Sequence, residues 1–448
     1  METTIHARAA LTPDGWRENV RLTLAAGTIR TVETGAAPQA RDERCIVLVP
    51  GMPNLHAHAF QRAMAGLAQV AGATPDSFWT WRVSMYEHAL RMTPDDVEAV
   101  AARAYAEMLE AGYTRVGEFH YLHHDRDGRP YANPAEMAAR VCAASAQAGI
   151  GMTLLPVFYA HSDFGGAPPV PEQRRFVCDR DLFGALHEAC RGLVAGLDGG
   201  RLGVAPHSLR AVTADELADL VAMAGEGPIH IHVAEQVREV EACRAATGAS
   251  PVAWLLDNAP VDGRWCLVHA THMDAQETAR LARSGAVAGL CPITEADLGD
   301  GVFPARAFRA AGGRLGIGTD SNVRITLAGE LRQLEYAQRL AERARNVLAP
   351  PGGSTGRALL DAALEGGASA LGVRAGLAAG ASADVVALGG EATDRLAGDC
   401  LLDAWIFARD VSVERVWARG RLVVREGRHV AREAIDRRFA VAMRSLSA

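Results

Sequence analysis

The 448-residue sequence contains no lysine: its lysine and arginine residues together number 46, and all of them are arginine. A chain without lysine cannot form a lysine Schiff base, cannot supply a P-loop lysine to a nucleotide phosphate and cannot hold two metal ions with a carbamylated lysine. These three kinds of catalytic site are therefore excluded.

The sequence also lacks the features that direct proteins to nucleic acid, membranes or oxidising compartments. The formal net charge is -7 and the arginines are scattered, so no basic surface for nucleic acid is predicted. No apolar run approaches the roughly 20 residues of a membrane span, and the amino terminus does not resemble a signal peptide. The eight cysteines contain no C-x-x-C pair, which is typical of reduced thiols. We expect a cytoplasmic protein.

The composition and length predict a large domain and a smaller one. Hydrophobic residues make up 49% of the chain and charged residues 22%, which supports a sizeable core. Short β-like runs occur near both ends of the chain, at residues 20–25, 28–32, 384–388, 413–418 and 421–424. We expect residues 1–48 and 375–448 to form a small β-sandwich domain and residues 49–374 to form the catalytic domain.

The middle of the chain alternates strand-like and helical segments. Helical periodicity is clear at residues 94–110, 134–148, 214–224 and 275–283. Eight apolar runs of strand length lie at residues 46–49, 114–119, 151–158, 202–206, 229–233, 266–269, 286–290 and 314–319. This alternation is typical of a (β/α)8 barrel or of a doubly wound open sheet.

Side chains that can bind metal stand where these runs end. His56 and His58 follow the first run, and His232, His269 and Asp320 end the fifth, sixth and eighth. Alone, His56 and His58 are more often surface or capping histidines of a loop, His269 a hydrogen-bonded core histidine, and Asp320 an aspartate in a turn. Together they would form one ring at the mouth of a barrel, which favours the barrel over the open sheet.

Neighbouring residues separate into candidates for chemistry and candidates for the core. Glu235, three residues after His232, would place a carboxylate base beside a metal ligand. His230 lies deeper in the same strand and is interpreted as a core histidine. The histidine-rich segment at residues 120–124 is interpreted as an exposed loop, and none of its histidines is assigned to a metal.

The sequence PNLHAH at residues 53–58, with His232, His269 and GTD at 318–320, resembles the metal-dependent amidohydrolase superfamily over nearly the whole chain. The segments HAFQRAMAGL (58–67), APHSLR (205–210), HVAEQ (232–236) and LCPITEADLGDG (290–301) resemble the formimidoylglutamate deiminase family within it. Ile293 and Asp297 stand where that family leads us to expect threonine and asparagine, which bears on substrate tuning.

The resemblance implies hydrolysis of N-formimidoyl-L-glutamate to N-formyl-L-glutamate and ammonia, by attack of a zinc-activated hydroxide on the amidine carbon. It implies one Zn2+ per subunit, although Fe2+ and Mn2+ accept the same ligands. The metal ligands that it implies are His56, His58, His232 and Asp320. Two-metal relatives carry a lysine where His207 stands, so a single ion is expected.

The resemblance also assigns roles in catalysis and in substrate binding. Catalysis is assigned to Glu235, His269 and Asp320. The two carboxylates of the substrate call for guanidinium partners. The residues that would bind the substrate are Gln61, Arg82, Tyr121, His207 and Arg210. The resemblance further implies a homodimer.

Two other functions remain open at this point. A deaminase of a heterocycle such as guanine would use the same metal site, but it would need stacking aromatic residues. With 6% aromatic residues, and with Arg82 and Arg210 following barrel strands, an acidic substrate is favoured. A non-catalytic barrel that only binds partners is disfavoured, because every expected ligand and Glu235 are present.

Overall fold

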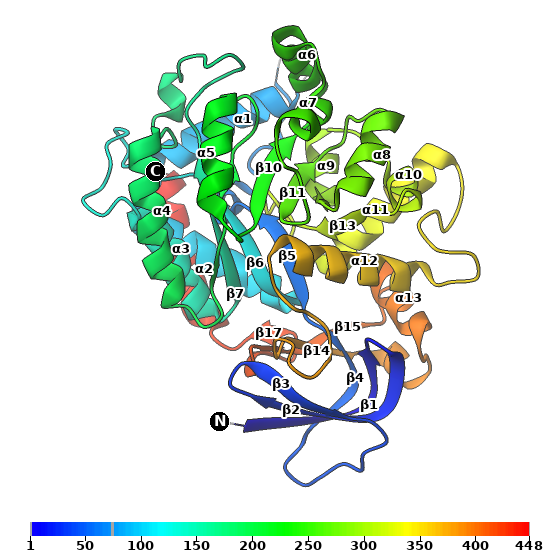
Figure 1. Cartoon of the computed structure of the whole chain (residues 1–448). Coiled ribbons are helices and arrows are strands. Elements are labelled where there is room, and N and C mark those ends of the chain that lie inside the picture. Colours follow the sequence, from blue (N-terminus) through cyan, green and yellow to red (C-terminus); the bar gives the residue numbers. More distant parts are fainter. Residues whose placement is uncertain (1, 73–75, 448) are drawn as a thin grey trace.

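Two arrangements of β-strands organise the computed structural model, which describes residues 2–72 and 76–447 (Figure 1). A sheet built from both ends of the chain lies at one end of the molecule, and a barrel of parallel strands surrounded by helices forms the rest (Figure 1). The predicted fold class, a (β/α)8 barrel with a small β domain, is confirmed.

The small sheet joins segments that are far apart in the sequence. Its strands are β1 (Glu2–Thr12), β2 (Gly15–Ala25), β3 (Thr28–Glu33), β4 (Glu43–Pro50), β14 (Val385–Gly389), β15 (Ser412–Ala418), β16 (Arg421–Arg425) and β17 (Arg428–His429). Strand β4 connects the two halves, because it pairs parallel with β1 and antiparallel with β14. The sheet has its own apolar core, which includes Ile5, Leu22, Val385 and Trp417.

The barrel strands follow the predicted order along the chain. They are β5 (Met52–Ala57), β6 (Tyr113–His120), β7 (Gly151–Phe158), the interrupted pair β8 (Arg201–Leu202) and β9 (Ala205–Pro206), β10 (Ile229–Val233), β11 (Trp265–His269), β12 (Val287–Leu290) and β13 (Arg314–Ile317). Backbone hydrogen bonds between residues 204 and 228–230 close one seam, and bonds between residues 56–58 and 319–320 close the other. The strands thus form a closed barrel and not an open sheet.

One strand prediction is wrong. Residues 46–49 lie in β4 of the small sheet, and the first barrel strand is β5, in which every residue is buried. This strand was not predicted because the polar Asn54 interrupts its apolar run. The Asn54 side chain is fully buried because its Nδ2 donates to Thr319 Oγ1 (2.7 Å) and its Oδ1 accepts from the Thr319 N–H (3.1 Å).

Helices cover the outside of the barrel. They are α1 (Phe78–Arg91), α2 (Pro94–Glu110), α3 (Glu136–Ala148), α4 (Arg180–Ala195), α5 (Ala214–Ala224), α6 (Val237–Thr247), α7 (Pro251–Asn258), α8 (Ala275–Ser284), α9 (Pro292–Leu298), α10 (Ala305–Ala310), α11 (Leu327–Glu342) and α12 (Thr355–Ala370). Local sequence sets their limits: α2 begins with a capping box between Thr93 and Asp96 and has Pro94 in its first turn. Of the helices that the described residues form, none has the length and apolarity needed to span a membrane.

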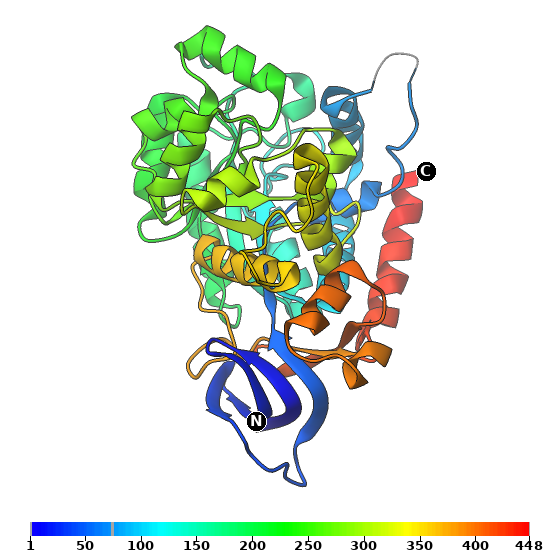
Figure 2. The same cartoon turned by 90° about the vertical axis from the view of Figure 1, so that its right-hand side faces the viewer.

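The C-terminal segment returns to the barrel. Helix α13 (Asp399–Phe407) packs on α12, and α14 (Arg432–Ser447) runs along the outside of the barrel against α2 (Figure 2). Arg432 forms ion pairs with Glu107 and Glu110 of α2, and Arg103 of α2 pairs with Asp436. The domain limits proposed from the sequence stay a prediction.

Candidate metal centre and active site

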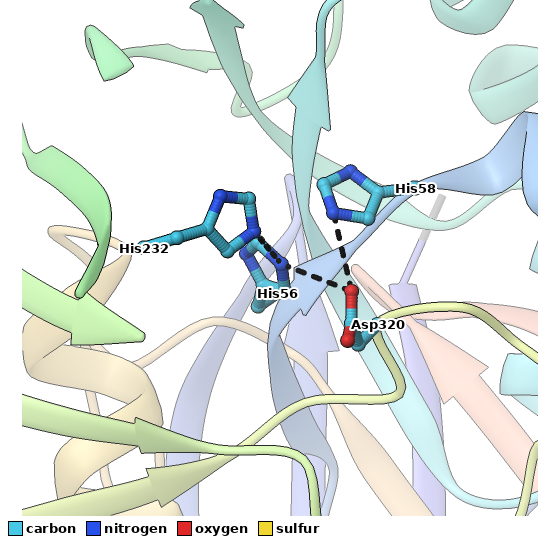
Figure 3. Close-up of side chains that lie close together, drawn as sticks. All are labelled: His56, His58, His232 and Asp320. Carbon is cyan, nitrogen blue, oxygen red and sulfur yellow. Dashed lines mark hydrogen bonds and ion pairs between the residues drawn. The ribbon is translucent and has the colours of Figure 1, made fainter. Parts of the chain in front are cut away.

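Four predicted metal ligands converge at the mouth of the barrel (Figure 3). His56 is in β5, His58 follows it, His232 is in β10, and Asp320 follows β13. The Nε2 atoms of His56 and His58 lie 3.3 and 3.1 Å from Asp320 Oδ1. The Nε2 atoms of His232 and His56 are 3.2 Å apart.

These distances match the spacing of ligand atoms that share one metal ion. With bonds of about 2.0–2.1 Å, neighbouring ligand atoms at tetrahedral angles lie about 3.3–3.4 Å apart. His58 Nδ1 faces the Phe119 carbonyl at 2.8 Å, and His232 Nδ1 faces the His207 carbonyl at 3.0 Å. Each Nδ1 therefore carries the hydrogen and each Nε2 presents a lone pair, which is the tautomer that binds metal.

The charges of the cluster also suit a cation. Burial lowers the pKa of His56 to about 3 and the pKa of His232 well below its usual range, so both imidazoles are neutral. Burial acts to raise the pKa of Asp320, but contacts with His56 and His58 outweigh it and hold that pKa well below its ordinary value. The cluster thus offers three imidazole nitrogens and one carboxylate.

The backbone around Asp320 is held in an unusual conformation. Asp320 has a φ of 43°, in the left-handed region. Asn322 stabilises it, because the Asn322 side-chain amide donates to the carbonyls of Asp320 and His58 at 3.0 Å each. A Cβ at Gly318 would lie 2.6 Å from the His56 carbonyl oxygen, so only glycine permits this approach of β13 to β5.

Two groups suited to proton transfer lie beside the metal ligands. His269 Nε2 is 3.7 Å from Glu235 Oε1 and 3.9 Å from Asp320 Oδ2. Burial raises the pKa of Glu235 to about 7. Burial acts to lower the pKa of His269, but the carboxylates of Glu235 and Glu295 outweigh it and hold that pKa well above its usual value. Glu235 can therefore take up and release a proton near neutral pH.

One cavity contains the five residues predicted to bind the substrate together with most of the site. Its lining includes Gln61, Arg82, Tyr121, His207, Arg210, His58, His232, Glu235, His269 and Asp320. Gln61 Nε2 donates to the Tyr121 hydroxyl at 2.7 Å, while burial holds the pKa of His207 well below its usual range. The structure brings the predicted residues together, and their roles stay predictions.

The arginines of this cavity have no acidic partner. Across the described ranges 2–72 and 76–447, neither Arg82 nor Arg210 forms a salt bridge or a side-chain hydrogen bond. Arg210 is only 6% exposed, and its Nε is buried without a partner. A buried guanidinium without a partner is unfavourable unless an anionic ligand binds to it.

Several residues that shape the site had no predicted role. Glu239 accepts hydrogen bonds from the N–H groups of Ala234 (3.2 Å) and Glu235 (3.1 Å) and so fixes the Glu235 backbone. Glu295 Oε1 lies 3.2 Å from His269 Nδ1, and Asp300 lies beside Glu235 and His269. Glu295 and Asp300 lie in the segment 290–301, which resembles the family motif, so that motif could have indicated that they belong to the site.

Three other predictions can be compared with the structure. Ile293 contributes its backbone N–H to the buried Glu330 carboxylate (2.8 Å), a bond that any non-proline residue can make. Asp297 is exposed and accepts a hydrogen bond from Gln69. The segment at residues 120–124 is buried and not exposed as predicted, and His123 and His124 bond to the carbonyls of Val157 and Val177.

A buried cluster of three histidines and an aspartate at the mouth of a (β/α)8 barrel, with a small β domain from both ends of the chain, defines a hydrolase of the amidohydrolase type. The amidohydrolase family model matches residues 47–423, and the model for the formimidoylglutamate deiminase HutF N-terminal domain matches residues 2–45. The chain is 50% identical to the formimidoylglutamate deiminase of Pseudomonas aeruginosa over 98% of each chain. It belongs to the amidohydrolase family and, within it, to the formimidoylglutamate deiminases, which confirms the resemblance found in the sequence.

Other proteins are also similar to the chain. The crystal structure of an amidohydrolase from Brucella melitensis is 57% identical, with a TM-score of 0.98 over 100% of each chain. An 8-oxoguanine deaminase from Pseudomonas aeruginosa is 29% identical over 67% of this chain and 66% of its own. A zinc-containing adenosine deaminase from Xanthomonas campestris shares the fold, with a TM-score of 0.80 at 23% identity, covering 99% of this chain and 98% of its own.

Proposed function

We propose that this chain hydrolyses N-formimidoyl-L-glutamate to N-formyl-L-glutamate and ammonia. The observation that supports this substrate most directly is the pair of guanidiniums, Arg82 and Arg210, in the cavity beside the metal ligands. Within the described residues, neither forms a salt bridge or a side-chain hydrogen bond, and both stack on Trp79. A small amidine that carries two carboxylates matches both features. The 50% identity to a formimidoylglutamate deiminase supports the same reaction.

We further propose that His56, His58, His232 and Asp320 hold one zinc ion per subunit. The ion supplies a Lewis acid that lowers the pKa of a water molecule towards neutrality. Three imidazole nitrogens and one carboxylate suit zinc, and iron or manganese would accept the same ligands. The absence of lysine supports a single ion.

The side chains around this centre have separate roles in moving protons and in orienting the water molecule. Glu235 accepts a proton from the attacking water and donates it to the terminal amidine nitrogen. His269, held by Glu295 at its Nδ1, and Asp320 orient the water through hydrogen bonds. Water adds across the C=N bond, the bond from carbon to the terminal nitrogen breaks, and ammonia leaves as the N-formyl product forms.

The substrate carboxylates would be held at the wall of the cavity away from the metal ligands. Arg82 and Arg210 bind them as charge-assisted hydrogen-bond donors. Gln61 and Tyr121, already bonded to each other, and the neutral His207 complete the polar contacts. Holding both ends of the substrate keeps the amidine carbon close to the water.

A panel of substrates tests this proposal. Purified enzyme with measured metal content is offered formimidoylglutamate, formimidoylaspartate and guanine, and ammonia release is followed. We expect formimidoylglutamate to give the highest kcat/KM. If guanine were the better substrate, or if no ammonia appeared from either amidine, the proposal would be wrong.

A heterocycle deaminase is the second candidate, because aromatic rings also line the cavity. Trp81, Tyr86, Tyr159 and Phe176 contribute to its wall, and such rings could stack on a planar base. A base, however, would leave the two guanidiniums without an anion. The guanine arm of the panel decides between the two candidates.

The location and assembly of the protein stay predictions. Free thiols at all eight cysteines support the proposed cytoplasmic location, since disulfides are typical of oxidising compartments. The homodimer is proposed from the family resemblance alone, and light scattering of the purified protein tests it.

A further inference from the structure

A second group of potential metal ligands adjoins the first. Glu235, His269 and Asp300 each offer a ligand atom, and these atoms lie within 4.8 Å of one another. The three residues are 5%, 0% and 3% exposed. Asp300 is placed there by the turn after α9, where its N–H donates to the Glu295 carbonyl at 2.9 Å.

Two atoms of this group form no hydrogen bond within the described part of the chain. They are His269 Nε2 and Asp300 Oδ2, and both are buried. The other polar atoms of these side chains are used: His269 Nδ1 contacts Glu295 at 3.2 Å, and Asp300 Oδ1 accepts from the Gln236 amide. The two atoms without a hydrogen bond therefore belong to the two side chains that lie beside Glu235.

We propose that Glu235, His269 and Asp300 form a second, inhibitory site for a divalent transition-metal ion such as Zn2+. Two carboxylates and one imidazole form a ligand set that zinc accepts, with a fourth position open. The 3.7 Å between His269 Nε2 and Glu235 Oε1 is close to the about 3.3–3.4 Å between ligands of tetrahedral zinc. The ion would also relieve the repulsion between two buried carboxylates.

Zinc binds ionised carboxylates and a neutral imidazole. Any protons that these three groups carry must therefore leave as the ion enters. The ion then occupies Glu235 and His269, which the proposed reaction uses for proton transfer. Inhibition therefore rests on the proposed function, whereas binding of a second ion does not.

The experiment counts zinc and activity separately. Enzyme that holds one equivalent of zinc is titrated with more Zn2+, while bound zinc is measured by calorimetry and elemental analysis. Ammonia release from formimidoylglutamate is measured at the same concentrations. We expect a second, weaker equivalent to bind and activity to fall over the same concentration range.

The variant Asp300→Asn tests the site directly, because Asp300 belongs to the second group and not to the first. We expect the second zinc to bind at least about tenfold more weakly, the first to stay, and the fractional inhibition at a given Zn2+ concentration to fall accordingly. Asp297→Asn is the matched control, since it makes the same change at an exposed residue three positions away. It should behave as the wild type does.

A second variant keeps the test decisive if Asp300→Asn does not fold. Glu235→Gln should retain the first zinc and lose affinity for the second, which binding shows without any activity. A wild type that binds only one zinc, or variants that bind the second as tightly as the wild type, would overturn the inference. Absence of ammonia from formimidoylglutamate would instead count against the proposed function and leave the zinc count valid.

Discussion

Two buried arginines at opposite ends of the barrel have different surroundings. Arg115, near the start of β6, is 3% exposed and donates to the carbonyls of Met152 and Gly199 at 2.8 Å each. Arg210, beyond the end of β9, is 6% exposed and has no hydrogen-bond partner among residues 2–72 and 76–447. Both residues are arginines with similar burial, but Arg115 forms hydrogen bonds to backbone carbonyls and, within these residues, Arg210 does not.

This difference distinguishes a buried arginine that stabilises the fold from a buried arginine that is available to a ligand. At the end of the barrel opposite the mouth, backbone carbonyls replace the water that hydrated the Arg115 guanidinium. Its hydrogen bonds to Met152 and Gly199 join neighbouring segments. At the mouth, Arg210 Nε, His269 Nε2 and Asp300 Oδ2 are buried without a hydrogen-bond partner among the described residues. Such unsatisfied groups lower stability and remain where a ligand completes them. The mouth is therefore the part of the barrel where substitutions should affect activity more than folding.

The largest expected effect is at Glu235. Glu235→Gln removes the group that carries the proton while it keeps the size of the side chain, so kcat should fall by about 10³-fold. The first equivalent of bound zinc and the midpoint of thermal unfolding should stay near their wild-type values. Steady-state kinetics with elemental analysis measures this, and activity within tenfold of the wild type would refute the role of Glu235.

Arg210 should show the next largest effect. Arg210→Ala should lower kcat/KM for formimidoylglutamate by about 10²-fold, because a charged hydrogen-bonded anchor contributes about 3 kcal/mol. Stability should change little, since no salt bridge or hydrogen bond to the described protein residues is lost. An unchanged kcat/KM would show that this guanidinium does not bind the substrate.

Arg115→Ala should have the reverse effect of Arg210→Ala, with a loss of stability and little change in activity. It removes the donor to two buried carbonyls, so the free energy of unfolding should fall by about 3 kcal/mol. The kcat/KM of the folded fraction should stay within about twofold of the wild type, because Arg115 is at the other end of the barrel. Calorimetry and kinetics on both arginine variants test the comparison, and similar profiles for the two would break it.

The smallest expected effect is a response to pH. Burial raises the pKa of Glu235 to about 7, and a general base must be deprotonated to act. Below that pH the protonated fraction grows, so kcat/KM should fall about tenfold per pH unit. Bound zinc is measured at each pH as the control. A profile that stays flat down to about pH 5.5 would contradict the assignment of Glu235 as the base.

Much of the fold was predictable, because hydrophobic periodicity marks buried strands and amphipathic helices. Segments such as Ile229–Val233 and Pro94–Glu110 were placed with the limits that the structure has. Strand β5 was missed because its buried Asn54 bonds to Thr319, which is 265 residues away in the sequence. A polar residue inside a strand is satisfied by tertiary contacts that periodicity does not contain.

The sequence by itself determined the class of protein. The order of His56, His58, His232, His269 and Asp320 at strand ends set the metal site, and the absence of lysine excluded other chemistry. Only the tertiary structure decided which polar atoms remain without partners. It separated Arg210 from Arg115 and brought Asp300 to Glu235, because hydrogen bonding inside a protein depends on segments that meet only when the barrel closes.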